Sequence, residues 1–277
     1  MKIELSPELL PLVTQVAQMV LEEANRFRLM TEAMRVFNNL KIQHKCVDCE
    51  IPSGSFFCNL QESTLRKLES LKISNLYPRG SILFIEGQMS NGVYILCDGR
   101  VKLSTCSRDG KIIILQIAES GEVLGLSAAV TDLPYEATAE VLEPCQVNYF
   151  RKTDFLRFLE QNGDACLSAV KQMSRNYQTA HLQICSLGLS SSVADKLAKL
   201  FLGWCNSNGN GNHHGNENGS IRLKINYTHE EIAEMIGTSR ETVSRLLKTF
   251  RERKLITLKG SDLIIHDKKK LETIVGV

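Results

Sequence analysis

The chain has 277 residues, of which 43% are hydrophobic and 23% charged, and its formal net charge is +2. This length suffices for two domains with separate cores, and the composition is that of an ordinary globular protein. No apolar run reaches the roughly 18 residues that a membrane span needs, and the N-terminus lacks the residue order of a signal peptide. We therefore expect a cytoplasmic protein with no membrane partner.

The sequence contains nine cysteines. An odd number in a reducing compartment argues against a disulfide framework. We interpret the cysteines as buried residues, metal ligands or redox thiols.

Residues 1–62 are predicted to form a helical extension with a cysteine cluster. Apolar residues recur at helical spacing from Glu4 to Ile42, which favours an amphipathic segment that packs on the rest of the protein. Cys46, Cys49 and Cys58 follow with the spacing C-x2-C-x8-C. Thiolates two residues apart can bind one metal ion or an iron–sulfur cluster, and such clusters usually take four ligands. A redox-reversible thiol pair and chemically inert cysteines are the alternatives.

Short β-prone runs separated by glycines extend from Tyr77 to Val147. Strands at intervals near ten residues with turn signals between them predict a β-barrel or a roll of two sheets. We assign residues 63–162 to this domain.

Residues 163–189 are predicted to form one helix with a dimer seam. Its apolar positions alternate by four and three residues, as in a coiled coil. About three heptads is near the lower limit for this pattern, so a helix packed on its own roll is the alternative. The seam residues are Val170, Met173, Tyr177, Ala180, Ile184 and Leu187.

Residues 190–277 are predicted to begin with a helix and a strand and to continue into two short helices joined by a turn. Thr228 and Glu231 have the spacing of a capping box, which predicts a helix start. Gly237 ends that helix, because glycine adopts a left-handed backbone at little cost. Thr238 or Ser239 then caps the second helix.

The second helix combines a buried stripe with an exposed polar face. Apolar residues lie at i, i+3, i+4 and i+7 from Val243 to Phe250. Residues 238–254 carry six Lys or Arg and two Asp or Glu, so the positive charge of the chain is concentrated there. Such a patch binds DNA phosphates, and arginine or glutamate can read G·C pairs in the major groove. The candidate DNA-binding residues are Thr228, Ser239, Arg240, Glu241, Thr242, Ser244, Arg245 and Lys248.

Two β-prone runs, 255–258 and 263–266, follow around a Lys-Gly-Ser-Asp turn and predict a β-hairpin wing. With the motif GTSRETVSRLLK, this segment resembles the winged helix-turn-helix of the Crp/Fnr superfamily of bacterial transcription regulators. The glycine order of residues 77–147 is similar to the cyclic-nucleotide-binding-type jelly roll of the same superfamily.

The resemblance implies an α+β protein with an N-terminal β jelly roll, a long dimerisation helix and a C-terminal winged helix-turn-helix. It also implies a homodimer that binds a pseudo-palindromic site on double-stranded DNA and acts with RNA polymerase. A two-fold dimer sets its recognition helices about 34–36 Å apart, which matches half-sites one turn of DNA apart.

Binding of cyclic AMP in the familiar mode of this superfamily is not expected. That mode uses a glutamate, an Arg-Ser pair and a Thr-Ser pair at three places. This chain has Leu126, then Glu136 with Ala137, then Ala180 with His181. A carboxylate in place of a phosphate-binding arginine repels the ligand.

The cysteine segment resembles the N-terminal cluster of the oxygen-sensing branch of the superfamily, which implies an iron–sulfur cofactor. The gap to Cys58 is longer than in that branch, and Asn148 stands where the distant fourth cysteine is expected. Cys145 is the nearest substitute, so we take Cys46, Cys49, Cys58 and Cys145 as the candidate metal ligands. Otherwise the effector is unknown.

We therefore predict a homodimeric DNA-binding regulator, not an enzyme, that responds to a redox, oxygen, NO or small-molecule signal. A thiol-redox enzyme using Cys46 and Cys49 is one alternative, although their C-x-x-C lies outside a βαβ context. A ligand-binding module without DNA binding is the other.

Overall fold

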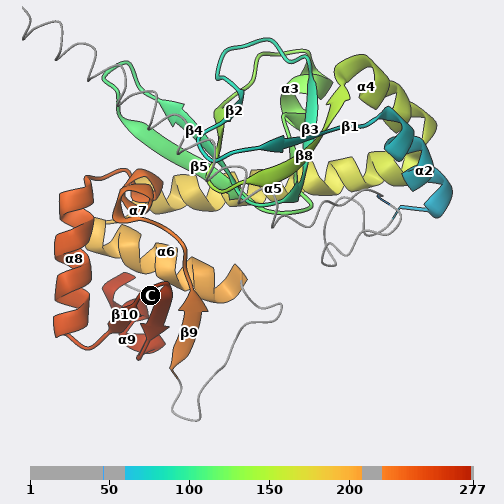
Figure 1. Ribbon diagram of the computed structural model, residues 1–277. Coiled ribbons are helices and arrows are strands. Elements are labelled where there is room, and N and C mark those ends of the chain that lie inside the picture. Colours follow the sequence, from blue (N-terminus) through green and yellow to red (C-terminus); the bar gives the residue numbers. More distant parts are fainter. Residues whose placement is uncertain (1–45, 47–59, 208–219, 276–277) are drawn as a thin grey trace, which may run out of the picture.

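The computed structural model of this protein describes residue 46, residues 60–207 and residues 220–275 (Figure 1). The predicted helical segment from Glu4 to Ile42 and the Asn/Gly-rich residues 208–219 lie outside this part of the chain. The described residues form a β-rich domain, one long helix and a C-terminal α/β domain, which confirms the predicted fold class.

The β-rich domain, which we call the roll, consists of two four-stranded antiparallel sheets. The strand orders are β1-β8-β3-β6 and β2-β7-β4-β5, so each sheet mixes strands from both ends of the domain. The helices α2, α3 and α4 flank these sheets. The elements are α2 (Glu62–Leu71), β1 (Ile73–Tyr77), β2 (Ile82–Phe84), β3 (Gly92–Asp98), β4 (Val101–Cys106), β5 (Ile112–Ala118), β6 (Val123–Leu124), α3 (Leu126–Thr131), β7 (Thr138–Val141), β8 (Cys145–Arg151) and α4 (Lys152–Gln161).

Aromatic side chains fill part of the roll interior. The rings of Phe84 and Tyr135 stack with their centroids 4.0 Å apart, and Tyr94 lies beside Phe84 at 5.5 Å. The Tyr135 hydroxyl donates to the carbonyl of Gly92 at 2.8 Å. Gly92 itself is required by packing, because an added Cβ would lie 2.1 Å from the backbone oxygen of Phe150. Tyr135 is therefore held in the interior both by ring packing and by a hydrogen bond.

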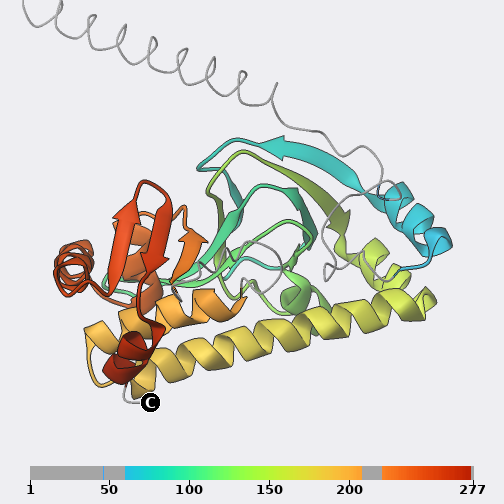
Figure 2. The same cartoon turned by 90° about the horizontal axis from the view of Figure 1, so that it is seen from below.

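The long helix α5 (Gly163–Leu189) runs along the roll and continues to the C-terminal domain (Figure 2). Small and polar residues near its start, such as Ala165 and Ala169, are buried against the roll. Asp164 ties this end to α2, because its carboxylate accepts from the Gln61 amide at 3.0 Å and from the Thr64 hydroxyl at 3.2 Å.

The C-terminal domain surrounds one apolar core that includes Phe201, Leu223, Val243, Leu247 and Leu263. The wing strands form a sheet of order β10-β11-β9, so the strand before the helix pair joins the predicted hairpin. The elements are α6 (Val193–Ser207), β9 (Ile221–Lys224), α7 (His229–Ile236), α8 (Arg240–Glu252), β10 (Ile256–Lys259), β11 (Asp262–Ile265) and α9 (Lys268–Val275). Within the described residues, no helix combines the length and apolarity that crossing a lipid bilayer requires.

Candidate nucleic-acid interface

The first helix of the pair, α7, begins and ends with the predicted signals. The Glu231 amide donates to Thr228 Oγ1 at 3.1 Å, and the Thr228 amide donates to Glu231 Oε2 at 2.6 Å. These two bonds satisfy amides that a helix start leaves without a helical acceptor. Gly237 follows the helix with φ of 67°, a left-handed conformation that residues with a side chain rarely adopt.

The second helix, α8, is capped by Ser239, whose Oγ accepts from the Thr242 amide at 3.3 Å. Val243, Leu247 and Phe250 are buried in the domain core, as predicted, whereas Leu246 is only half-buried. The opposite side faces solvent. Among the candidate contacts, Thr228, Ser239, Arg240, Glu241, Arg245 and Lys248 are exposed, and Thr242 and Ser244 are half-buried.

The helix α8 has an acidic residue near each end, Glu241 and Glu252, and its basic residues are spread along its length from Arg240 to Arg251. Hydrogen bonds to backbone and to Ser239, with Arg240 nearby, hold the pKa of the Glu241 carboxyl below its usual range. This carboxylate lies in the first turn, where the helix dipole favours negative charge. Lys248 lies one turn from Glu252, with Nζ and Oε1 3.9 Å apart, a distance at which an exposed pair contributes little. The basic face is thus available to phosphates.

One contact within the face is not evident from the sequence. His229 Nδ1 and Ser244 Oγ are 2.9 Å apart, which joins the first residue of α7 to the middle of α8. Helical spacing alone gives no sign of it, because the two residues belong to different helices. His229 therefore joins the candidate surface.

The seam residues of α5 divide into two sets. Val170, Tyr177 and Ile184 are 56%, 71% and 70% exposed in the single chain, at steps of seven residues. Ala180 is also exposed. Met173 instead packs against the core of its own roll. The exposed row of three large apolar residues is therefore the part of the seam that is open to a second chain.

Leu187, the last seam residue, faces the helix-turn-helix. A Cβ placed on Gly237 would lie 3.7 Å from Leu187 Cδ2 and 3.8 Å from Lys111 Nζ. The turn between α7 and α8, the end of α5 and the β4–β5 hairpin thus meet at one place, which we call the turn junction. The amide of Gln183 adds a hydrogen bond from α5 to the carbonyl of Ile114 in β5.

Glu136 lies beside the first turn of α3, where the cyclic-AMP mode would need an arginine. Its Oε1 accepts from Ser127 Oγ at 2.5 Å. A carboxylate therefore occupies the side of α3 on which the aligned arginine was expected, and Ala137 next to it is buried. This arrangement presents no cation to a phosphate at that point.

The four candidate metal ligands are not brought together in the described part of the chain. Cys46 is buried with Phe150 and Phe155, and its Sγ is 3.9 Å from the Nζ of Lys72, immediately before β1. Cys145 pairs with Tyr77, the last residue of β1, and belongs to a different core cluster. Cys49 and Cys58 lie outside the described residues.

Cys145, the candidate fourth ligand, does not lie beside Cys46 in the structure. The two cysteines lie at opposite ends of β1, and burial, with Asp98 and Glu143 nearby, raises the pKa of the Cys145 thiol to about 12. Metals bind thiolates, which such an environment disfavours. The described residues also contain no group of three His, Cys, Asp or Glu side chains suited to a metal ion. Burial and strand position set Cys145 apart from Cys46, and the ligand set of Cys46, Cys49, Cys58 and Cys145 stays a prediction.

Two family models match the chain. A cyclic nucleotide-binding domain matches residues 75–162, and a Crp-like helix-turn-helix domain matches residues 195–274. The two matches correspond to the roll and to the C-terminal domain and cover more than half of the chain.

Similar proteins of known role are transcription regulators. A CRP-like cAMP-activated global transcriptional regulator of Mycobacterium tuberculosis is 25% identical over 195 residues, covering 70% of this chain and 84% of its own. The anaerobic regulatory protein of Bacillus subtilis is 26% identical over 207 residues, covering 73% and 83%.

A solved structure has the same fold. A CooA mutant from Carboxydothermus hydrogenoformans superposes with a TM-score of 0.67 at 21% identity, covering 83% of this chain and 99% of its own. With the two matching domains in the same order around a long helix, the chain belongs to the Crp/Fnr superfamily of transcription regulators.

Proposed function

We propose that this protein is a homodimeric, sequence-specific DNA-binding transcription regulator whose signal is not cyclic AMP. The observation that carries the DNA-binding role is the exposed polar face of α8, presented by a helix pair with both N-terminal caps formed. Arg240, Glu241 and Arg245 on this face have the chemistry to read G·C pairs.

Dimerisation is supported by the exposed apolar row on α5. Three large apolar side chains at seven-residue steps on one solvent-facing helix are costly in a monomer and suited to a parallel two-helix seam. A two-fold dimer presents two α8 helices to half-sites one turn of DNA apart. RNA polymerase is the further partner that such a regulator requires.

Selection from genomic fragments, followed by footprinting, tests the DNA-binding role. We expect a protected pseudo-palindromic site that Arg245→Ala weakens, whereas Arg222→Ala, at an exposed arginine in β9, leaves it nearly unchanged. Folded protein that protects no site in any redox state or with any effector would overturn the proposal. Activity in a disulfide reductase assay would favour the enzyme alternative instead.

Absence of cyclic-AMP control is supported by Glu136 and Ala137 beside α3. Titration calorimetry with cyclic AMP should give no binding heat, under conditions in which the cAMP-activated Mycobacterium tuberculosis relative serves as the positive control. Saturable micromolar binding that responds to Glu136→Ala would refute this part of the proposal.

We propose that the signal enters through the segment of Cys46, Cys49 and Cys58, as an iron–sulfur or redox signal. The Lys72 Nζ lies 3.9 Å from Cys46 Sγ, so a cation borders the thiol that either chemistry would use. Anaerobic purification, an absorption spectrum and analysis for iron, sulfide and zinc provide the test. Cys46→Ser should reduce the metal content, and Cys106→Ser, at an exposed cysteine of β4, should not. Metal-free, colourless wild-type protein would exclude a metal site.

A further inference from the structure

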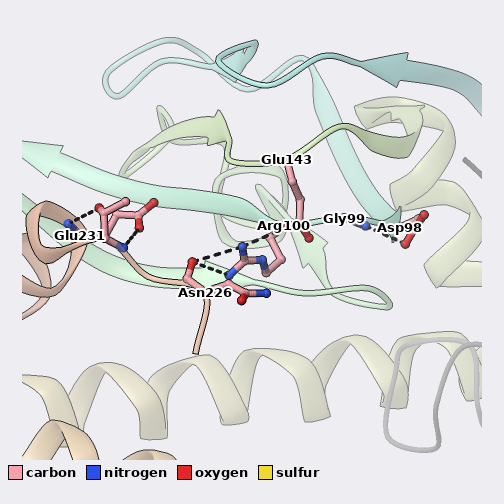
Figure 3. Close-up of polar contacts among 7 residues, drawn as sticks. Asp98, Gly99, Arg100, Glu143, Asn226 and Glu231 are labelled. Carbon is pink, nitrogen blue, oxygen red and sulfur yellow. Dashed lines mark hydrogen bonds and ion pairs between the residues drawn. The ribbon is translucent and has the colours of Figure 1, made fainter. Parts of the chain in front are cut away.

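Arg100 lies where the roll meets the helix-turn-helix domain. It follows Gly99 in the turn between β3 and β4. Figure 3 shows its guanidinium between Glu143 of the roll and Asn226, the second residue before Thr228. Nη2 donates to Glu143 Oε2 at 3.0 Å, and both Nη1 and Nη2 lie 3.4 Å from the Asn226 carbonyl oxygen. One side chain thus joins the two domains through residues that are 126 positions apart in sequence.

The same guanidinium contacts the core of the C-terminal domain through Tyr227. Its central carbon lies 5.6 Å from the centre of the tyrosine ring, a distance suited to a cation–π contact. Tyr227 in turn packs on Trp204 of α6, with ring centroids 5.1 Å apart. Arg100 therefore contacts a residue anchored in the DNA-binding domain, and not only a loop at its surface.

Lys102 forms a second link two residues further along β4. Its Nζ lies 2.9 Å from Glu140 Oε2 in the neighbouring strand β7 and 3.7 Å from Glu234 Oε2 in α7. The Lys102 and Glu234 side chains are only 12% and 14% exposed. The Glu234 oxygen is buried without a hydrogen-bond partner among the described residues, so its compensation is the charge of Lys102.

Removing one charge of the Lys102–Glu234 pair has a different energetic cost from removing both. Burial raises the pKa of the Glu234 carboxyl, and the Lys102 ammonium opposes that shift. Removal of Lys102 alone leaves a buried carboxylate with no compensating cation, which is strongly unfavourable. Removal of both charges leaves the Glu140 carboxylate without Lys102, but the Glu140 side chain is 37% exposed and can be hydrated. No residue of α8 takes part in either link, so its exposed face stays free of them.

We propose that Arg100 and Lys102 are positioning residues that hold α7, and through it the recognition helix α8, in the orientation used for DNA. This inference rests on the proposed DNA-binding function. A contact that fixes the helix pair before DNA binding reduces the conformational entropy that is lost when DNA binds. The chemical partner of the two cations is the acidic, aromatic side of the C-terminal domain formed by Tyr227, Glu231 and Glu234.

A charge-neutral cycle between Lys102 and Glu234 tests the inference on the full-length protein. Lys102→Met should weaken binding to the selected operator by about 5- to 150-fold, the usual range of coupling between sites. Adding Glu234→Gln to Lys102→Met should restore most of the lost operator affinity. The matched control is Lys102→Met with Glu230→Gln, which has the same net charge and alters the same helix at an exposed position. Equal rescue by both double variants, or no loss in the single variant, overturns the inference.

The first link is tested with Arg100→Ala, and Arg79→Ala is its matched control. Both remove one arginine from the roll, and Arg79 lies exposed in the turn after β1. Only Arg100→Ala should broaden the preferred spacing between half-sites, as measured with operators whose central spacer differs in length. A structural role without positioning would lower the melting temperature and leave the spacing preference unchanged.

Hydrogen exchange separates failure of this inference from failure of the DNA-binding role. In protein without DNA, Arg100→Ala and Lys102→Met should accelerate amide exchange in residues 226–236, and Arg79→Ala should not. Wild-type protein that binds no DNA would overturn the function, and the exchange result would still decide whether the two cations hold α7. Unchanged exchange in both variants would overturn the positioning role.

Discussion

The imidazole of His229 and the hydroxyl of Ser244 are within hydrogen-bonding distance, with Nδ1 and Oγ 2.9 Å apart. This contact fixes the hydroxyl in the middle of α8 from the first residue of α7. A side chain held in one rotamer reads a base edge more selectively than one that rotates freely.

We expect His229→Ala to relax the base preference at the position that Ser244 contacts. The loss should be about 0.5–1.5 kcal/mol, the net worth of one neutral hydrogen bond. Competition binding with single-base operator variants measures it. Ser244→Ala should remove the same preference, and the double variant should lose no more than either single one. Additive losses would mean that the two residues act separately.

Arg245 and Lys254 should differ in the kind of loss that their removal causes. Arg245 lies on the exposed face of α8, whereas Lys254 follows the helix. Arg245→Ala should cost about 1–3 kcal/mol and relax selectivity at one G·C pair. Lys254→Ala should weaken all sequences alike and flatten the salt dependence. Salt titrations on matched and mismatched operators distinguish the two, and identical behaviour would refute the division.

Tyr177→Asp should convert the protein to a monomer. Tyr177 is 71% exposed and lies between Val170 and Ile184 in the apolar row of α5. A carboxylate at this position would be buried next to its own copy across a two-fold seam. Sedimentation velocity at micromolar concentration measures the change. Leu182→Asp is the control, because Leu182 is similarly exposed but lies on another side of the helix. Equal effects of both variants would contradict the assignment of the seam.

Glu122 should make the roll less stable as the pH rises. Burial raises the pKa of its carboxyl, although Gln116 Nε2 and the Glu119 amide both donate to it. The folded state therefore holds a proton that the unfolded state has released, and stability falls as pH rises from the unfolded value through the raised one. Urea unfolding of wild type and Glu122→Gln from pH 4 to 8 tests this. The stability difference should shift in favour of the glutamine variant with rising pH, and a constant difference would contradict it.

The elements that local signals define were predictable from the sequence. Local signals define the ends of the helix pair. The capping box of Thr228 and Glu231 starts α7, Gly237 ends it, and the Ser239 cap starts α8. The β-prone runs around the Lys-Gly-Ser-Asp turn similarly predicted the hairpin of β10 and β11, whereas the pairing of β9 with β11 was not predicted. These signals involve residues that are close in sequence, so the rest of the fold hardly alters them.

Features that depend on distant residues could not be predicted. The helix α9 (Lys268–Val275) begins with three lysines, and it packs against α6 through Leu271, which is fully buried. The link from Arg100 to Asn226 needs the relative placement of two domains. The sequence makes Cys145 the nearest candidate for a fourth ligand, and only the pairing of β1 with β8 shows that it lies beside Tyr77 at the end of β1.

The turn junction limits how independently the parts of this protein can move. Leu187 at the end of α5 and Lys111 on the β4–β5 hairpin both border Gly237 in the helix turn, because a Cβ added at Gly237 would touch each of them. A shift of α5 by a single residue moves its end by about 1.5 Å, which is enough to break such a contact or to force the turn aside. A movement of α5 along its axis would therefore act directly on the turn between α7 and α8, and through it on α8, whatever caused the movement.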